Sequence, residues 1–356
     1  MTGEQHNDEE LALAFLRSLR LLATDHYDKP EFTLEQNGVG FAPLGNIMAI
    51  CAEMKNGKTW LMLSLAIALL KGEWGDLKST IQNPRILWFD TEQDKYDTML
   101  ILRRIHQMVP NWDYNVDHDE FQIYNLRNIR HDKRREAIIS AIKYLKPTVV
   151  FVDGIRDLVQ SVNEEQKCYD LINEFMSITA EHHCSIWSVL HVNPNSDKMR
   201  GHLGTELGNK VTDVFNVKKE KDKNTGNITF AVEQVAARHR DIDGWKFTIR
   251  DYPNTKLYSV PYMLTVTEAR KVEADKWQSM HDYFAVHMPN ELKTYSKTNL
   301  KESIAKAEGI GVTKAWEKVK AAIEAQVLEQ CIDGKFRLKK NRPDNSILEE
   351  QTEMPF

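Results

Sequence analysis

The sequence is poor in cysteine, and its cysteines lie far apart. Only four occur in 356 residues: Cys51, Cys168, Cys184 and Cys331. They form neither a CxxC pair nor a cysteine and histidine set with zinc-ligand spacing. This pattern argues against a disulfide framework and against a zinc site, so we interpret the four thiols as small fillers of the core.

Long apolar runs and an excess of positive charge are also missing. The longest apolar run, residues 60–70, is much shorter than the ~20 residues that a membrane-spanning helix needs. Residues 1–10 are polar and acidic, unlike a signal peptide or an import presequence. We therefore expect a cytoplasmic protein without a membrane partner. The net charge of −5 excludes a protein that coats nucleic acid by bulk charge, so any DNA contact must come from a local patch.

Short apolar runs alternate with helical patterns between residues 47 and 191. Strands are expected at residues 47–50, 85–90, 121–125, 148–153 and 185–191, and helices at 60–70, 96–109, 134–145 and 166–180. Such alternation predicts an α/β fold with a parallel sheet, whose ligands lie at the carboxyl ends of the strands. The chain is also long enough to favour one large and one small domain.

The segments on either side of this alternation have other patterns. Residues 9–23 carry apolar side chains at steps of three and four, which predicts an amphipathic helix that packs on the core or on a neighbouring subunit. Residues 31–44 contain Gly38, Gly40 and Pro43, and we expect a loop that leads into the first core strand. Beyond residue 212, four strand patterns follow without helices, which predicts an antiparallel meander at the sheet edge.

Helical periodicity returns near residue 265 and predicts three helices, the last two separated by Gly309 and Gly311. Asp333 and Gly334 then form a hairpin turn signal between two short strands. Three helices and a hairpin predict a winged helix. The predicted divisions are an N-terminal helix and linker at 1–34, a core at 35–262, a winged helix at 263–341 and a disordered tail at 342–356.

The chemistry is expected to centre on residues 52–59, Ala-Glu-Met-Lys-Asn-Gly-Lys-Thr, between a strand and an apolar helix. The spacing is that of a P-loop, with alanine in place of the first glycine. A loop that opens a helix points its backbone N–H groups at one spot, where the helix dipole also favours negative charge. We expect ATP here, with Lys58 on the β- and γ-phosphates and Thr59 on Mg²⁺. The expected nucleotide-binding residues are Ala52, Lys55, Asn56, Gly57, Lys58, Thr59 and Trp60.

A second nucleotide residue is expected at Asp153, which ends an apolar strand as the Walker B carboxylate does and would bind Mg²⁺ through water. Many P-loop ATPases carry the catalytic glutamate directly after this aspartate, but here Gly154 follows it. The general base must therefore come from elsewhere. Glu92 is the candidate, because it follows the strand at residues 85–90, and Asp90 and Asp94 compete with it.

Polar and basic residues follow the last parallel strand, which ends at His191. Residues 193–210 contain several glycines and basic side chains, which suits a mobile loop that contacts phosphates or DNA. Its candidate DNA-binding residues are Lys198, Arg200 and Lys210. Arg238 and Arg240 follow the second meander strand. Without a functional role, His191 would be an exposed histidine at a strand end, and residues 193–210 would be a charged surface loop. Arg238 and Arg240 would then belong to a solvated basic hairpin.

In their order, these motifs resemble the RecA-type core of the RepA/DnaB-like hexameric helicase ATPases of plasmids and mobile elements. The resemblance covers residues 35–262 and rests on the P-loop, Asp90-Thr91-Glu92, Asp153-Gly154, His191, Arg200-Gly201-His202-Leu203-Gly204 and Arg238-x-Arg240. Two positions depart from the family pattern. Ala52 replaces a glycine, and Ala236 stands where DnaB-like proteins often have lysine.

The resemblance implies an ATP- and Mg²⁺-dependent homo-oligomer, a hexameric ring that binds ATP between subunits and single-stranded DNA in its channel. Glu92 would orient and deprotonate the attacking water, and His191 would hydrogen-bond the γ-phosphate. Arg238 or Arg240 would reach into the site of a neighbouring subunit. The sequence does not decide between these two arginines.

The C-terminal module fits DNA binding, with the helix at residues 313–326 in the major groove and the hairpin on phosphates. The candidate basic residues are Lys314, Lys318, Lys335 and Arg337. Winged helices also dock proteins. Two other functions stay open: a recombinase-like or regulatory ATPase that assembles on DNA or partner proteins without unwinding, and a DNA-binding adaptor with a structural nucleotide site.

Overall fold

A nine-stranded β-sheet forms the centre of the computed structural model, which describes residues 3–113, 115–193, 199–221, 226–251, 258–290, 293–340 and 342. The strand order is β13-β12-β11-β10-β3-β9-β8-β6-β7. The strands are β3 (Ile47–Ala52), β6 (Ile86–Asp90), β7 (Phe121–Asn125), β8 (Val149–Asp153), β9 (Ser185–His191), β10 (Asp213–Lys221), β11 (Ile228–Ala237), β12 (Trp245–Asp251) and β13 (Ser259–Met263). Neighbours run parallel from β10 to β7 and antiparallel from β10 to β13. The expected α/β fold with a mostly parallel sheet is confirmed.

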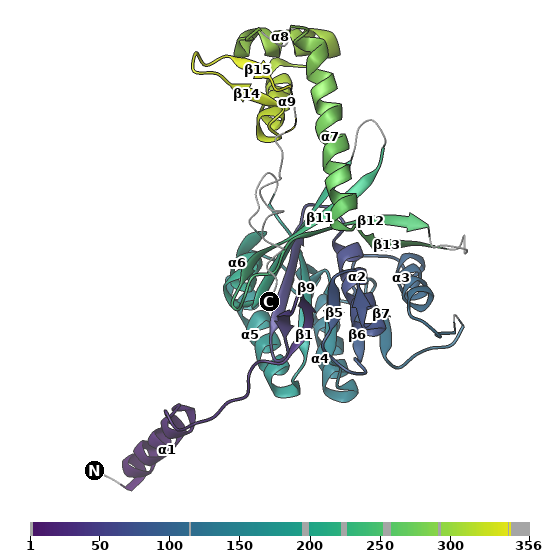
Figure 1. Cartoon of the computed structure of the whole chain (residues 1–356). Coiled ribbons are helices and arrows are strands. Elements are labelled where there is room, and N and C mark those ends of the chain that lie inside the picture. The colour runs from purple at the N-terminus through teal and green to yellow at the C-terminus, as the bar shows by residue number, and fades with distance from the viewer. Residues whose placement is uncertain are drawn as a thin grey trace, which may run out of the picture.

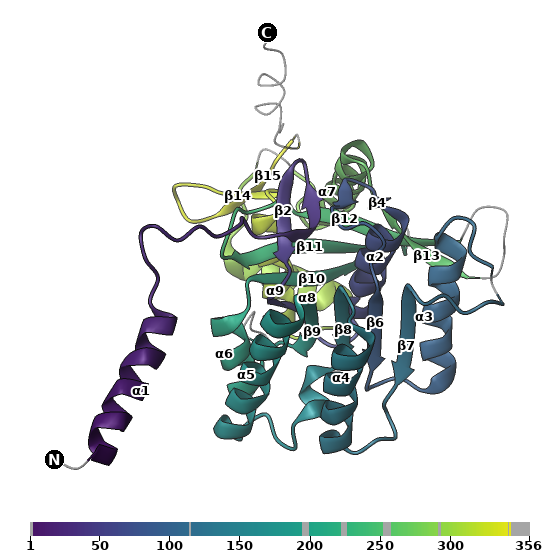
Figure 2. The same cartoon turned by 90° about the horizontal axis from the view of Figure 1, so that it is seen from below.

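Helices cover both faces of the parallel part of the sheet (Figures 1 and 2). The helices α2 (Lys58–Lys71) and α3 (Lys95–Met108) pack on one face. The other face carries α4 (His131–Leu145), α5 (Glu165–His182) and α6 (Gly201–Lys210). Because both faces are covered, every residue of β3, β6 and β8 is buried. Because these strands pair parallel and in register, their carboxyl ends lie along one edge of the sheet.

The segment at residues 31–44 is a β-hairpin, so the prediction of a loop was wrong. The strands β1 (Phe32–Gln36) and β2 (Val39–Pro43) pair antiparallel around Asn37 and Gly38. Both turn residues have positive φ, 51° and 78°, as a type I′ hairpin turn requires. The Asn-Gly pair was the available signal. The hairpin starts three residues before the predicted core boundary and joins β5 (Leu77–Ser79) and β4 (Glu73–Trp74) in a second sheet.

Helix α6 occupies most of the stretch that was expected to be a mobile loop, so that prediction was also wrong. Its glycines allow close packing instead of mobility. A Cβ atom on Gly204 would lie 2.5 Å from the backbone of Met199, and one on Gly208 would lie 3.1 Å from the Met199 side chain. Leu203 and Leu207 are fully buried on the same helix. Residues 194–198, including Lys198, lie outside the described residues.

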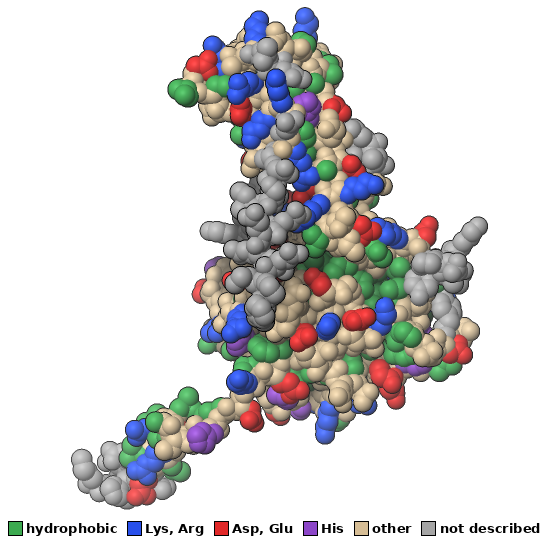
Figure 3. All heavy atoms as spheres, viewed as in Figure 1, with side chains coloured by type: hydrophobic (Ala, Val, Ile, Leu, Met, Phe, Trp, Pro, Cys, Tyr) green, Lys and Arg blue, Asp and Glu red, His purple; other side chains and the backbone are tan. Residues whose placement is uncertain are grey.

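Helix α1 (Gly3–Leu19) stands apart from the rest of the molecule and is joined to β1 by an extended segment (Figure 1). Its large apolar side chains are more than half exposed: Leu11, Leu13, Phe15, Leu16 and Leu19. Figure 3 shows hydrophobic side chains on the surface of this helix. The predicted helix is present, and the structure leaves its apolar side chains exposed to solvent.

The C-terminal part has its own apolar core around Trp277, Phe284, Leu300, Val319 and Phe336. Its elements are α7 (Val266–His287), α8 (Lys297–Glu308), α9 (Val312–Glu324), β14 (Leu328–Gln330) and β15 (Phe336–Leu338). Helix α7 rises from the sheet and carries the other elements at its far end (Figure 1). The expected helices and hairpin are present, while the winged-helix assignment and the domain boundaries remain predictions. The predicted disordered tail lies outside the described residues except for Arg342.

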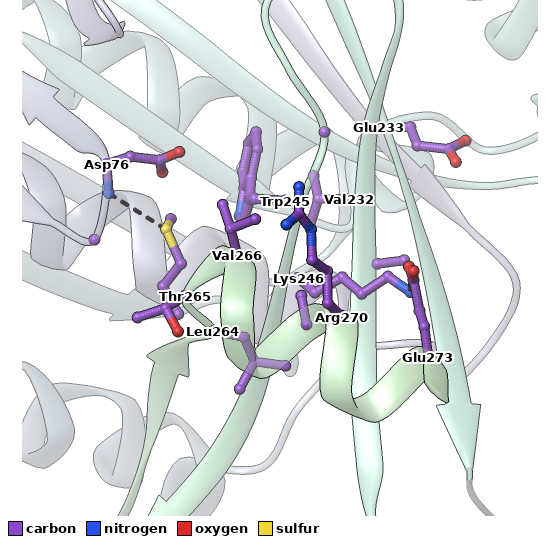
Figure 4. Close-up of a pocket in the computed structure, with 15 residues that line it drawn as sticks. Asp76, Val232, Glu233, Trp245, Lys246, Leu264, Thr265, Val266, Arg270 and Glu273 are labelled. Carbon is purple, nitrogen blue, oxygen red and sulfur yellow. Dashed lines mark hydrogen bonds and ion pairs between the residues drawn. The ribbon is translucent and has the colours of Figure 1, made fainter. Parts of the chain in front are cut away.

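An apolar groove of about 740 Å³ lies at the foot of α7. Figure 4 shows Val232 and Trp245 on the sheet side of the groove, with Leu264 and Val266 at the start of the helix. The backbone N–H of Asp76 donates to Met263 Sδ across 3.4 Å at its rim. None of the predicted site residues lines this groove, so it does not mark the expected nucleotide site.

Two sequence features can be located directly. Cys51, Cys168 and Cys184 are buried, Cys331 is partly exposed, and all four are free thiols. Within the described part of the chain, no helix combines the length and the apolar character needed to cross a membrane.

Candidate functional site

The carboxyl ends of four parallel strands bring the predicted residues to one edge of the sheet. Ala52, the last residue of β3, pairs in register with His191 at the end of β9. Asp90 and Asp153 pair in the same way at the ends of β6 and β8. Strand β9 lies between β3 and β8, so His191 stands between the P-loop strand and the strand that carries Asp153.

The P-loop connects β3 to α2, and Gly57 is its last residue before the helix. Gly57 has φ +90°, and a Cβ atom there would lie 2.3 Å from the ring of Phe230 on β11. Glycine is therefore required both by the backbone conformation and by the close approach of an aromatic ring. The helix starts with its first backbone N–H groups unpaired within the helix, as an anion site needs.

Lys58 is folded into the loop that precedes it. Its Nζ donates to the carbonyl oxygens of Ala52 at 3.3 Å and Glu53 at 2.7 Å, and it lies 2.9 Å from Nδ1 of His191. Burial lowers the pKa of the Lys58 ammonium, and the negative charges of Glu92 and Asp153 oppose this shift. A buried cation surrounded by oxygen acceptors is placed to exchange them for phosphate oxygens.

Thr59 and Asp153 are in direct contact, and Thr59 Oγ1 donates to Asp153 Oδ2 across 2.8 Å. Burial raises the pKa of Asp153 to about 7, the charges of Asp90 and Glu92 add to the rise, and the Thr59 hydrogen bond opposes it. A hydroxyl and a carboxylate beside a phosphate loop are suitable Mg²⁺ ligands. Among the described residues, no group of three or more His, Cys, Asp or Glu could hold a metal by itself. Phosphate and water oxygens would have to complete the coordination shell.

The three carboxylates after β6 have different surroundings. Asp90 is fully buried and accepts hydrogen bonds from the backbone of Glu92 and Gln93 and from Thr98 Oγ1. Asp94 accepts from two backbone N–H groups at the start of α3, so it caps that helix. The Glu92 side chain is 44% exposed, and its Oε1 lies 3.7 Å from Nε2 of His191. Glu92 is thus the carboxylate that faces the site.

The environment of Glu92 favours its ionised form. The polar contact with His191 lowers the pKa of Glu92, burial opposes that effect, and the charge of Lys58 lowers the pKa further. Because Lys58 donates to Nδ1 of His191, the neutral imidazole carries its proton on Nε2, on the side of Glu92.

Gly154 makes room for the segment that carries Glu92. It has φ +105°, and a Cβ atom there would lie 2.3 Å from Thr91 Oγ1 and 3.1 Å from Glu92 Cγ. A side chain at position 154 would therefore collide with the segment that follows β6 and carries Glu92. Thr91 lies within the Asp90-Thr91-Glu92 motif, but the sequence predicted neither this close contact nor a role for it.

Comparison with known families agrees with this geometry. The sequence matches the family described as an AAA domain over residues 16–197, just over half of the chain. The chain belongs to the AAA domain family. The matched range includes the P-loop, Glu92, Asp153 and His191, and the prediction of a P-loop ATPase core is confirmed.

Two solved structures are similar to this AAA domain protein. One is the flagellar accessory protein FlaH of Methanocaldococcus jannaschii, 14% identical, with a TM-score of 0.43 over 60% of this chain and 88% of that chain. The other is a KaiC-like protein of Pyrococcus horikoshii, 14% identical, with a TM-score of 0.42 over 66% and 99% of the two chains. No curated protein matches the sequence.

The two arginines that follow β11 in this AAA domain protein have different environments. The Arg238 guanidinium donates to the carbonyl oxygens of Asn209 at 3.0 Å and Val211 at 3.1 Å, where it caps the end of α6. Arg240 is exposed to solvent. Arg238 is therefore committed within its own chain, while Arg240 is available for an external contact.

The basic residues after β9 lie at the two ends of α6. Arg200 is exposed, directly precedes α6 and donates its backbone N–H to the carbonyl of His191 across 3.0 Å. Lys210 is the last residue of α6. The chain thus returns to the end of β9 before the helix begins, and Arg200 lies beside the nucleotide site.

Other predicted residues are engaged in local contacts. The Trp60 ring is covered by the guanidinium of Arg104, whose carbon lies 4.6 Å from the ring centroid. Three of the four C-terminal candidates pair with acids: Lys318 with Glu308, Lys335 with Asp333 and Arg337 with Glu329. Lys314 is exposed.

Proposed function

We propose that this AAA domain protein hydrolyses ATP with Mg²⁺ and uses the energy as a motor on DNA. The specific form we favour is a RepA-like helicase in the replication or transfer of a mobile element. The observation that carries the proposal is the meeting of Lys58, Thr59, Glu92 and Asp153 at one edge of the sheet.

In the proposed reaction, Thr59 and Asp153 would hold Mg²⁺, which would supply positive charge beside the phosphates. Lys58 leaves the carbonyl oxygens of the loop and binds the β- and γ-phosphates. Glu92, kept ionised by its neighbours, orients the attacking water and accepts its proton. His191 contacts both Lys58 and Glu92, so it would sense whether the γ-phosphate is present.

We further propose that the site is completed by a second copy of the chain in a homo-oligomer, as a hexamer. Arg240 is the residue we assign to the neighbouring site, because Arg238 is held by the carbonyl oxygens at the end of α6. The exposed apolar side chains of α1 support assembly, since a monomer would leave Leu11, Phe15 and Leu19 in water.

The DNA contacts are proposed for two regions. One comprises basic residues that follow β9 in the chain: Arg200 at the start of α6, Lys210 at its other end, and Lys198, which lies outside the described residues. In the C-terminal part, Lys314 on α9 is the exposed candidate for a phosphate contact, with Lys318, Lys335 and Arg337 available only if their ion pairs open.

A second candidate function is a recombinase-like or regulatory ATPase that does not unwind DNA. The ion pairs of the C-terminal part favour it, because basic side chains already paired with Glu308, Asp333 and Glu329 contribute less to phosphate binding. Such a module suits protein docking. An adaptor whose nucleotide site is structural is the third possibility.

The deciding experiment measures ATP hydrolysis by the full chain with and without single-stranded DNA, beside strand displacement on a forked duplex. We expect hydrolysis that Lys58→Ala and Glu92→Gln abolish, with nucleotide binding kept in Glu92→Gln. Lys71→Ala, at the exposed end of the same helix, is the matched control. Hydrolysis without displacement would favour the regulatory function, and Glu92→Gln turning over at the parent rate would reject the assigned base.

A further inference from the structure

Thr91 directly precedes Glu92 in the segment that follows β6. It is 2% exposed. Its Oγ1 lies 2.9 Å from the carbonyl oxygen of Asp153, 3.1 Å from that of Gly154 and 3.1 Å from Oδ2 of Asp157. Its backbone N–H donates to the Asp153 carbonyl across 3.2 Å. Thr91 therefore fastens the segment that carries Glu92 to the end of β8.

Asp157 belongs to the short 3₁₀-helix η1 (Ile155–Leu158) that follows Gly154. Two arginines hold its carboxylate: Arg134 Nη1 lies 3.5 Å from Oδ2, and Arg156 Nη1 lies 3.5 Å from Oδ1. Arg134 Nη1 also donates to the Asp157 carbonyl across 3.3 Å. The acceptor used by Thr91 is thus itself fixed from α4.

Arg134 joins this group to a third segment. Its Nε donates to the carbonyl of Ile129 at 2.7 Å and its Nη2 to that of Arg127 at 2.6 Å, both in the loop between β7 and α4. The Arg134 side chain is only 13% exposed, and arginine does not lose its proton in proteins. Arg134 therefore ties Asp157 to the loop that precedes α4.

Among these contacts, those to the backbone carbonyl of Asp153 come nearest to the phosphate side of the site, and the Asp153 carboxylate is held separately by Thr59. Lys58 Nζ is held by the carbonyl oxygens of Ala52 and Glu53 and by the ring of His191. Thr59 Oγ1 is held by the Asp153 carboxylate. A change in the contacts among Thr91, Asp157 and Arg134 should therefore shift Glu92, while Lys58 and Thr59 keep their positions. Displacing a catalytic group by about 1 Å can cost roughly 10²-fold in rate.

We infer that Thr91, Asp157 and Arg134 are positioning residues that hold the Glu92 carboxylate at the site of the attacking water. This inference rests on the proposed ATP hydrolysis. It assigns a function to contacts among the β6–α3 segment, η1 and α4, and of the three residues only Thr91 lies within a sequence motif.

The test compares Thr91→Val, which keeps the shape and removes the hydroxyl, with Thr91→Ser, which keeps the hydroxyl. In the full chain, Thr91→Val should lower kcat by roughly 10²-fold, and Thr91→Ser should stay within about threefold of the parent. KM for ATP and the Kd of a non-hydrolysable analogue should change by less than about twofold in both variants, because the lost interaction acts on Glu92.

Two further measurements separate positioning from general stability. In a Glu92→Gln background, Thr91→Val should cause no further loss, because its effect passes through Glu92. If Thr91→Val unfolds, Asp157→Asn serves instead, with the same expected loss of kcat and unchanged nucleotide binding. A Thr91→Val protein that hydrolyses ATP at the parent rate, or that loses binding as much as kcat, would overturn the inference. A parent protein without ATPase activity would instead overturn the proposed function.

Discussion

Lys58 Nζ lies 2.9 Å from Nδ1 of His191, and the other nitrogen of the same ring lies 3.7 Å from Glu92 Oε1. One imidazole therefore connects the lysine of the P-loop to the carboxylate that faces the site. These two contacts join three segments that are far apart in the chain and that end at the same edge of the sheet. Four predictions follow from the site and from the surfaces around it.

Replacing His191 should change the pH dependence of hydrolysis. The contact with His191 is the main cause of the lowered pKa of Glu92, so His191→Phe should let that pKa rise. Activity that needs ionised Glu92 is present above its pKa and is lost as the pH falls through it. The acid limb of the kcat/KM profile should therefore move to higher pH in His191→Phe. His202→Phe, on the exposed face of α6, is the control, and an unmoved acid limb in both would contradict the coupling.

Gly154 should tolerate no side chain. In Gly154→Ala, the methyl group would meet Thr91 Oγ1 at 2.3 Å and the backbone would be held at φ +105°. We expect a loss of about 1–3 kcal/mol in the free energy of unfolding, with a larger fall in kcat than in ATP affinity. Gly38→Ala is the matched control, because it has φ +78° but open space around the new methyl group. It should lose about 1 kcal/mol and keep its activity. Chemical denaturation and steady-state kinetics measure both effects, and equal effects in the two variants would show that only backbone conformation matters.

The two arginines after β11 should respond differently to truncation. Arg238→Ala removes the cap on the end of α6 and should lower the melting temperature. Arg240→Ala should leave the melting temperature unchanged and lower hydrolysis by roughly 10³-fold or more, because it acts on the neighbouring site. Calorimetry and ATPase assays on the assembled protein distinguish them. Full activity of Arg240→Ala, or a fully active monomer in sedimentation, would reject the role in trans.

The apolar side of α1 should contribute to assembly. Phe15 and Leu19 are 64% and 61% exposed and lie four residues apart, on one side of the helix. The double variant Phe15→Glu, Leu19→Glu should lower the oligomeric state in sedimentation velocity while the melting temperature of the core is kept. Arg17→Glu adds negative charge on the opposite side of the same helix and should assemble like the parent. Assembly that survives the double variant would show that α1 contacts something else.

Local pattern was sufficient wherever the physical cause was local. The apolar runs of β3, β6, β8 and β9 predicted buried parallel strands, because a strand covered on both faces must be apolar along its length. The P-loop could be predicted for the same reason, since its helix start and its glycine conformation depend on neighbouring residues. The Asn37-Gly38 hairpin was equally local, and its turn signal was overlooked.

The sequence pattern gave a wrong prediction where one residue type occurs in different kinds of structure, as glycine does in loops and in closely packed helices. The glycines of residues 201–208 were interpreted as a sign of mobility, but in α6 they allow close packing, of Gly201 against Val162 and of Gly204 and Gly208 against Met199. Spacing in sequence does show Gly201, Gly204 and Gly208 at steps of three and four, which is one side of a helix. Whether this side of a helix packs against another part of the chain depends on the tertiary fold, which the local sequence does not show.

The sequence by itself determined the α/β alternation, the phosphate loop and the aspartate that ends the strand β8, because each is encoded in a few consecutive residues. Only the tertiary structure separated Glu92 from Asp90 and Asp94, and Arg240 from Arg238. The deciding contacts form only when the chain folds: Thr98, eight residues along the chain, binds Asp90, and the end of α6, 27 to 29 residues earlier in the chain, binds Arg238. Residues of the same type at neighbouring positions differ in their contacts because folding gives some of them buried partners and leaves others exposed to solvent.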